Sequence, residues 1–202
     1  MISFILCGLF IALFAFVDVW YFVRGIHFVL QRLLASIMGQ RRQRKHTEED
    51  IFRVSCVRGI VLPSDLDMMW HMNNSKYLRE LDFGRFKLFS RLFYPTVRKL
   101  KGSFALNAIS IRYRRSLLLW QWFTIESKVL CWKDDGMYLE QRFIGDGDKF
   151  VYAIALIKFV VRGEGLTMDI VMETAVTGEI SSPPSPPEVK GWIESISSPV
   201  RG

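Results

Sequence analysis

The sequence predicts an α+β domain in which one long helix packs on an antiparallel sheet. Apolar residues three and four apart run from about Asn73 to Leu92, which is helical spacing. One strand-like run precedes this helix and four follow it, separated by turn residues. A single helix among strands joined by short turns is typical of α+β domains rather than of repeated βαβ units.

Length and charge limit what the chain is. Its 202 residues allow one domain of ordinary size with appendages. A net charge of +7 suits an anionic membrane surface, a nucleic acid or a phosphate-bearing ligand. Cys7, Cys56 and Cys131 form no CxxC pair and have no ligand spacing, so we expect no disulfide scaffold and no metal site. Cys56 and Cys131 lie in strand-like runs, where we expect buried, reduced thiols.

Residues 1–24 form a hydrophobic leader. From Ile2 to Val23 the chain is almost wholly apolar, about the ~20 residues that cross a bilayer core. No positive charge precedes this run and no small-x-small cleavage site follows it, whereas basic residues do follow. We therefore expect a retained signal anchor in an endomembrane such as the endoplasmic reticulum, with the remaining chain in the cytosol. Cleavage and secretion are the alternative.

Residues 25–50 are expected to form an amphipathic, basic juxtamembrane linker. Apolar residues recur there at helical spacing, and a basic cluster occupies residues 41–45. Such a segment fits an anionic membrane surface, and a solvated linker is the alternative. The cluster has no interleaved aromatic residues and no nucleic-acid-binding motif accompanies it, so we expect no nucleic-acid partner.

Residues 51–165 are expected to form the domain. Phe52, Val54 and Cys56 alternate with polar residues, and this first strand ends by Pro63. The long helix follows, with Gly84 in its apolar stripe, and Tyr94-Pro95 ends it. Since Gly84 has no side chain, we expect another element to pack very close to it.

Four further strands are expected after the helix, and turn residues at 133–136 and 145–148 separate the last three into hairpins. The last strand is apolar at nearly every position, which is typical of a strand covered on both faces. The expected strands are Phe104–Arg112, Trp122–Trp132, Met137–Ile144 and Phe150–Val161. Residues 166–202 form an extension with a Pro-rich linker and a short helix, Glu188–Ile196, that docks on the domain.

Polar residues concentrate directly before the long helix. Within ten residues the chain places Asp65, Asp67, His71, Asn73 and Asn74. A carboxylate can activate water or attack a carbonyl, and the unpaired N–H groups of a helix start can hold a developing negative charge. The structural alternatives are a turn or cap role for the aspartates, a satisfied structural histidine, and asparagines that cap the helix.

The pattern from Asp65 to Leu78, D-L-D, three residues, then H-M-N-N-S-K-Y-L, resembles the active-site segment of hot-dog-fold thioesterases, in particular their acyl-ACP and acyl-CoA branch. This resemblance implies a long central helix wrapped by a five-stranded antiparallel sheet. It also implies hydrolysis of a thioester between an acyl group and a pantetheine carrier. The partner would be an acyl-CoA or acyl-carrier thioester, with coenzyme A as part of the substrate and no separate cofactor. A homodimer is expected because the family pairs its sheets.

The resemblance also assigns roles to single residues. It places Asp67 on the catalytic aspartate and His71 on the histidine of the motif. Asn73, Asn74 and Tyr77 fall on residues that open the helix, where they would serve substrate or oxyanion binding. The chain departs from the pattern at its centre, where Met69 replaces an asparagine of the acyl-ACP branch and Trp70 a glycine of other branches.

Two further expectations follow. Arg112 and Arg114 could bind the phosphates of coenzyme A, since arginine suits phosphate geometry, although a solvated strand end explains them as well. Because the centre of the motif is apolar, a catalytically weak or inactive protein that binds acyl thioesters or lipids is the alternative to an active thioesterase.

Overall fold

The computed structural model describes residues 18–37, 46–134 and 136–197, which belong to two compact units divided between Arg44 and Lys45. The first unit contributes helix α2, Val19–Ile37. Most of the expected anchor, Ile2–Val23, lies outside the described residues. Among the residues that are described, no helix combines the length and the apolar character needed to cross a bilayer.

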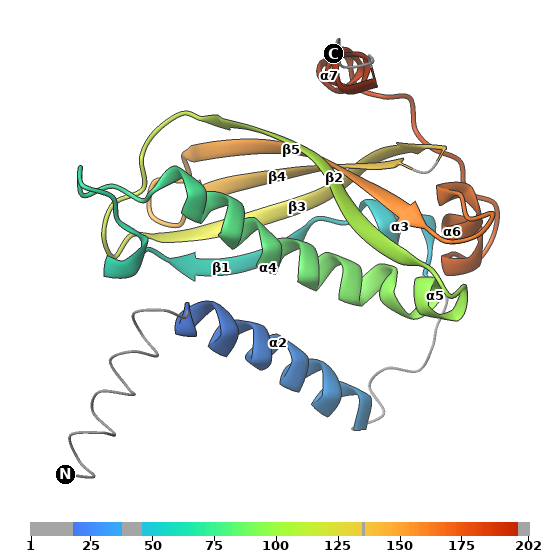
Figure 1. Cartoon of the computed structure of the whole chain (residues 1–202), viewed down its shortest axis with the longest axis horizontal. Helices are drawn as coiled ribbons and strands as arrows, with labels where there is room; N and C mark the ends of the chain where they lie inside the picture. Colours follow the sequence, from blue (N-terminus) through green and yellow to red (C-terminus); the bar gives the residue numbers. More distant parts are fainter. Residues whose placement is uncertain (1–17, 38–45, 135, 198–202) are drawn as a thin grey trace. The chain divides into compact units, whose positions relative to one another are not determined.

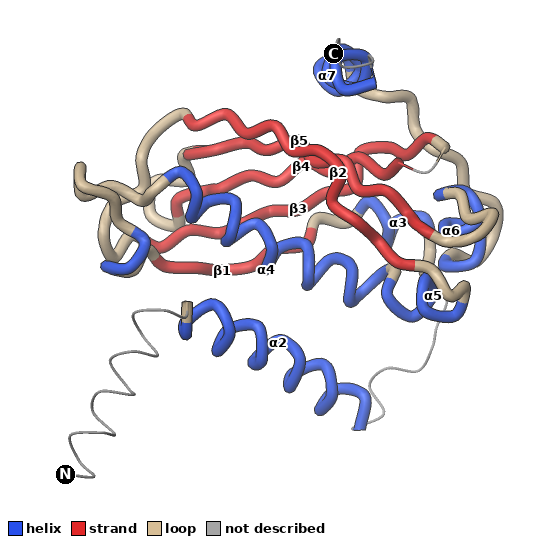
Figure 2. Tube along the Cα trace, in the orientation of Figure 1, coloured by secondary structure: helices blue, strands red, loops and turns tan. Residues whose placement is uncertain are grey.

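The second unit is built on a five-stranded sheet, and every neighbouring pair of its strands is antiparallel (Figures 1 and 2). In space the strands follow the order β1-β3-β4-β5-β2, so that β1 and β2 form the two edges. The strands are β1 Ser55–Ile60, β2 Ser103–Tyr113, β3 Trp122–Lys133, β4 Gly136–Gly145 and β5 Val151–Arg162. The predicted α+β class is confirmed, and the last four strands agree with the predicted ranges to within one residue at each end.

Helix α4, Asn74–Leu92, packs on the sheet as the periodicity predicted (Figure 1). Its buried stripe includes Tyr77, Leu81 and Leu88. Gly84 lies where the helix meets the sheet most closely. A Cβ atom there would lie 2.5 Å from Nε2 of Gln141 and 2.7 Å from Oγ of Ser127. The expected close approach at Gly84 is confirmed, and the buried polar side chains of β3 and β4 cause it.

The start of the domain differs from the prediction. Helix α3, Glu48–Phe52, begins with a reciprocal cap, in which Thr47 Oγ accepts the Asp50 N–H and Asp50 Oδ2 accepts the Thr47 N–H. Because this cap draws Phe52 into a helix, the first strand begins later and its inward positions are residues 55, 57 and 59. Cys56 therefore faces outward, and the expectation that it is buried is wrong. Cys131 is buried as expected, and burial raises the pKa of its thiol.

Three further helices complete the unit: α5 Tyr94–Lys99, α6 Met168–Ala175 and α7 Pro187–Ser197. Pro95 ends α4 as predicted, but it also sits in the first turn of α5, where a missing N–H costs nothing. Helix α6 was not predicted, although its Met168, Val171 and Met172 are fully buried in the main core. Helix α7 confirms the predicted C-terminal helix, and its Val189 packs with Tyr138 in a second, smaller core.

Candidate active site

The motif before α4 folds into a tight hairpin. The Asp67 N–H donates to the His71 carbonyl at 2.9 Å, and the Trp70 N–H donates to the Asp67 carbonyl at 3.1 Å. Met68, Met69 and Trp70 form the three-residue tip between them. Trp70 has φ +61°, the left-handed conformation that commonly closes three-residue hairpin loops and that favours glycine. The tip therefore places a large side chain at a position where glycine would adopt the backbone conformation more easily.

The Asp67 carboxylate has one fixed oxygen and one open oxygen. Oδ1 accepts the Met69 N–H at 2.8 Å and the His71 N–H at 3.3 Å. Within the described part of the chain, no group donates a hydrogen bond to Oδ2. The residue is half-buried, so part of it stays accessible to a water molecule or a substrate.

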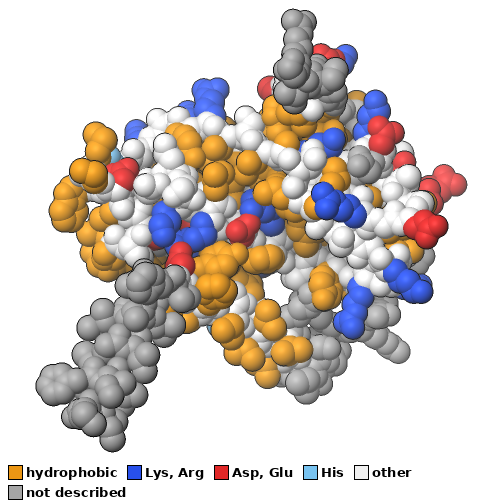
Figure 3. All heavy atoms as spheres, viewed as in Figure 1, with side chains coloured by type: hydrophobic (Ala, Val, Ile, Leu, Met, Phe, Trp, Pro, Cys, Tyr) orange, Lys and Arg blue, Asp and Glu red, His pale blue; other side chains and the backbone are white. Residues whose placement is uncertain are grey.

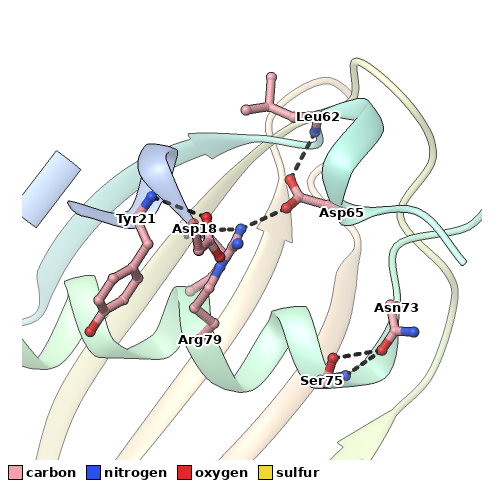
Figure 4. A network of polar contacts seen from close by, with 8 residues as sticks. Asp18, Tyr21, Leu62, Asp65, Asn73, Ser75 and Arg79 are labelled. Carbon is pink, nitrogen blue, oxygen red and sulfur yellow. Dashed lines mark hydrogen bonds and ion pairs between the residues drawn. The ribbon is translucent and has the colours of Figure 1, made fainter. Parts of the chain in front are cut away.

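Asp65 lies two residues earlier and is engaged on both oxygens (Figure 4). Its Oδ2 accepts the Leu62 N–H at 2.9 Å, and its Oδ1 accepts Nη2 of Arg79 at 2.6 Å. Its carbonyl also accepts the Asn73 N–H at 2.8 Å. Only 2% of the residue is exposed. Asp65 thus ties the loop to α4, as expected for a turn residue.

The start of α4 lies directly beside this hairpin. Asn73 caps the helix, because its Oδ1 accepts the N–H of Ser75 at 2.9 Å and the Ser75 hydroxyl at 2.7 Å (Figure 4). Asn74 is the exposed first helical residue, and its carbonyl accepts the Tyr113 hydroxyl at 3.0 Å. No described residue accepts a hydrogen bond from the Asn74 N–H. This N–H can therefore donate a hydrogen bond to an anionic oxygen.

His71 and Tyr77 differ in burial and in the hydrogen bonds of their side chains. The His71 ring is half-buried, and no described residue forms a hydrogen bond with it, although its backbone pairs with Leu118. Tyr77 is fully buried, and its hydroxyl accepts the Leu117 N–H at 2.9 Å. Burial raises the pKa of Tyr77 to about 12. This hydroxyl holds the loop beside the motif, and its part in substrate or oxyanion binding stays a prediction.

Arg112 and Arg114 lie at the end of β2, away from the hairpin in sequence. Both are exposed. Arg114 Nη1 donates to the Val151 carbonyl at 3.3 Å, and its guanidinium lies 4.9 Å from the centre of the Phe150 ring. A role for these arginines in phosphate binding stays a prediction. Across the described residues, no group of three His, Cys, Asp or Glu side chains could hold a metal ion.

A pocket lies along the C-terminal half of α4, between this helix and the sheet. It encloses about 620 Å³, and apolar side chains form most of its wall: Phe86, Phe89, Val97, Phe104, Leu106 and Phe159. Arg85 and Asp82 reach the pocket and pair with each other, and Arg98 and Lys101 contribute further positive charge. Because α4, α5, β2 and β5 all contribute to the wall, no single stretch of sequence carries a signal for this pocket.

Sequence comparison gives matches over most of the chain. The family model described as the thioesterase-like superfamily matches residues 61–193. Protein THEM6 of Xenopus laevis is 39% identical over 188 residues, which cover 93% of this chain and 85% of that protein. Protein THEM6 of Danio rerio is 35% identical and covers 92% of this chain and 87% of its own length.

Structure comparison gives more distant matches. The crystal structure of YbaW, a probable thioesterase from Escherichia coli, has a TM-score of 0.54 and 24% identity, and the match covers 61% of this chain and 99% of that chain. A hypothetical protein from Aquifex aeolicus has a TM-score of 0.51 and 14% identity, with coverage of 60% and 98%. At these identities the similarity concerns the fold.

Proposed function

Because this chain belongs to the thioesterase-like superfamily, we propose that its domain hydrolyses acyl thioesters of the acyl-CoA type, with Asp67 as the reactive carboxylate. The observation that carries this proposal is the arrangement around Asp67. Two loop amides fix Oδ1, while Oδ2 accepts no hydrogen bond from the described residues. The open N–H of Asn74 begins α4 beside the same hairpin.

The proposed reaction uses these groups in order. Asp67 Oδ2 takes a proton from water as the water oxygen bonds to the thioester carbon. The carbonyl oxygen gains the negative charge, and the N–H groups at the start of α4 stabilise it. When the carbonyl re-forms, the carbon–sulfur bond breaks and the thiolate leaves with the proton that Asp67 held. Direct attack by Asp67 on the carbonyl, followed by hydrolysis of the anhydride, is the alternative route.

His71 completes the proposed site. Its backbone is fixed on both sides, by the Asp67 N–H and by pairing with Leu118, while its ring forms no hydrogen bond with the described residues. The ring can therefore orient the substrate or share in proton transfer.

The pocket along α4 is the proposed site for the acyl chain. An α-helix rises 1.5 Å per residue, so the pocket begins at Asp82 roughly 12 Å along the helix from Asn74. Its volume of about 620 Å³ is in the range of small-molecule sites, and its wall is mainly apolar. An acyl chain that starts at the reactive carbon would extend along α4 toward this pocket.

The Asp67→Asn variant tests the role of the carboxylate. Asparagine keeps Oδ1 as an acceptor for the two loop amides but removes the negative charge, so we expect kcat to fall about 100-fold or more with the fold intact. The measurement is release of the coenzyme A thiol from acyl-CoAs of varied chain length by the full chain in detergent. Unchanged turnover in Asp67→Asn would exclude this carboxylate as the reactive group.

The Leu106→Trp variant tests the acyl pocket. Leu106 is 47% exposed and lines the pocket, so a larger side chain narrows the pocket without filling the core. We expect kcat/KM for a long-chain acyl-CoA to fall about tenfold, while the value for acetyl-CoA stays unchanged. An equal loss on both substrates would place the acyl chain elsewhere.

The apolar tip of the hairpin supports a second candidate function. By the resemblance, Met69 stands where the acyl-ACP branch carries an asparagine and Trp70 where other branches carry a glycine. Together with Met68, these side chains offer no polar group beyond the indole N–H. Such a domain would bind acyl thioesters without turnover. Saturable binding of a non-hydrolysable acyl-CoA by a chain that releases no thiol from any acyl-CoA would favour this function.

The homodimer and the membrane anchor stay predictions. Strand β2 is an edge of the sheet, and no described strand pairs with its outer side, so a second copy could pair there. The anchor and the location in an endomembrane depend on residues that lie mostly before those described.

A further inference from the structure

Two loop tips expose large apolar side chains at one end of the domain. Met68 is 98% exposed, and Met69 and Trp70 are each 74% exposed. In the loop between β2 and β3, Leu118 is 52% and Trp120 is 56% exposed. We call these five residues the loop-tip patch. Figure 3 shows hydrophobic side chains projecting at the end of the domain where Figure 1 places these loops.

The two loops form one surface because hydrogen bonds join them. The Met72 N–H donates to the Leu117 carbonyl at 2.9 Å, and His71 and Leu118 form a β-bridge. The Trp120 N–H donates to the Val61 carbonyl at 3.0 Å. Backbone hydrogen bonds therefore hold the bases of both loops in place, and the five residues of the patch form one surface.

The backbone at both tips is held in a conformation that large side chains avoid. Trp70 and Trp120 both have φ +61°. The left-handed region costs free energy for a residue with a Cβ atom, and both side chains stay mostly exposed, so burial within the domain offsets little of this cost. Two exposed tryptophans at strained positions are explained if a partner outside the domain covers them.

The chemistry of the patch fits a lipid surface. Tryptophan prefers the boundary between hydrocarbon and water, and methionine and leucine side chains can enter the hydrocarbon. Arg112, Arg114 and Arg115 are exposed and lie shortly before Leu117 and Leu118 in the sequence. Arg115 pairs with Asp148 at 3.3 Å, so Arg112 and Arg114 supply the net positive charge next to the second tip. Basic residues beside inserted apolar side chains are typical of attachment to anionic lipids.

We propose that the loop-tip patch inserts into the surface of a bilayer that contains anionic lipids. Projecting tips with adjoining arginines fit a deformable, negatively charged surface better than the flat face of another protein. The inference does not depend on catalysis. Should the domain act as a thioesterase, insertion would hold Asp67 at the lipid surface, where long acyl thioesters partition.

A fluorophore at the tip tests this proposal in the full chain. The variant Met69→Cys, made with Cys7→Ser and Cys56→Ser, is labelled with a nitrobenzoxadiazole dye and reconstituted into vesicles of phosphatidylcholine and phosphatidylserine. The matched control carries Glu173→Cys instead, at an exposed position of α6, which lies at the other end of the domain (Figure 1). Both variants keep the same N-terminal residues, so the difference between them reports the tip alone.

The readout is quenching by lipids that carry a spin label near the headgroup. We expect emission from residue 69 to fall about twofold or more, while emission from residue 173 stays nearly unchanged. Replacing phosphatidylserine with phosphatidylcholine should weaken the quenching at residue 69. Equal quenching at both positions would overturn the proposal. A dye at residue 69 that is shielded but unquenched, and that loses its shielding when protein is diluted in lipid, would show that a second copy covers the patch, which also overturns it.

Discussion

The motif hairpin carries one aspartate at its base and one beside its tip, and the two differ in burial and in hydrogen bonding. At the base, Asp65 is buried, and Leu62, Arg79 and Asn73 satisfy its carboxylate and carbonyl. Beside the tip, Asp67 has one carboxylate oxygen that accepts no hydrogen bond from the described residues, and the three side chains that follow it are apolar and exposed. Two aspartates only two residues apart thus have different tasks, since one fixes the loop on the helix and the other faces solvent.

This difference separates stability from function along the segment. The carboxylate and the carbonyl of Asp65 form their hydrogen bonds within the domain, so changing Asp65 should cost folding free energy. Groups at the tip have few partners within the domain, so changing them should cost activity or binding instead. The predictions below test this separation, beginning with the largest expected effect on stability.

Asp65→Asn should lower the free energy of unfolding by about 3–5 kcal/mol, because it removes one partner of a buried ion pair. The new amide group would also face a donor, either the Leu62 N–H or the Arg79 guanidinium. Urea denaturation monitored by circular dichroism measures the loss. A cost below about 1 kcal/mol would contradict a structural role for Asp65.

Ionisation of Tyr77 should lower the free energy of unfolding at alkaline pH. Burial raises the pKa of Tyr77 to about 12, above its unfolded value near 10, so the folded state favours the protonated phenol. Its contribution is complete below pH 10 and is lost as the pH rises through 12, by about 3 kcal/mol in all. Unfolding measured across this range should show the loss.

The Tyr77→Phe variant is the control for that titration. It should lack this alkaline step, and at neutral pH it should lose about 1–3 kcal/mol because the buried Leu117 N–H no longer has its acceptor. An alkaline step of the same size in Tyr77→Phe would assign the titration to another group.

Trp70→Gly should have the smallest effect and the opposite sign. Glycine adopts the left-handed conformation freely, so relief of strain outweighs its larger entropy in the unfolded chain, and we expect a gain of about 0.5–1 kcal/mol. Met69→Gly is the matched control, since Met69 lacks a positive φ and should gain nothing. A gain of equal size in both variants would show that strain at Trp70 is not the cause.

Much of the fold was predictable because its signals are local. The spacing of apolar residues predicted α4, and the turn residues predicted the hairpins around β4. The predicted hot-dog architecture is confirmed by the helix-on-sheet arrangement and by the similarity to YbaW. The first strand was misplaced because a short capped helix took Phe52, and α6 was missed because its eight residues are too few for a clear period.

The site was predictable only in part. The motif singled out Asp67, His71 and the asparagines; the first two flank the tip of the hairpin and the asparagines begin α4, and their roles stay predictions. The partner of Asp65 was not predictable, because Arg79 lies fourteen residues further along the chain and the pairing depends on the tertiary fold. The same reason explains the pocket, whose wall comes from four elements, and the loop-tip patch, whose two loops are far apart in sequence.

The most direct test of the separation compares one substitution at both positions, Asp65→Asn and Asp67→Asn, with unfolding free energy and acyl-CoA turnover measured on each full-length variant. The account predicts that Asp67→Asn unfolds within about 0.5 kcal/mol of the unmodified chain, yet loses about 100-fold or more in kcat. It predicts that Asp65→Asn is strongly destabilised but retains turnover at temperatures where it stays folded. Turnover that survives in Asp67→Asn, or that is lost in folded Asp65→Asn to the same extent, would contradict it.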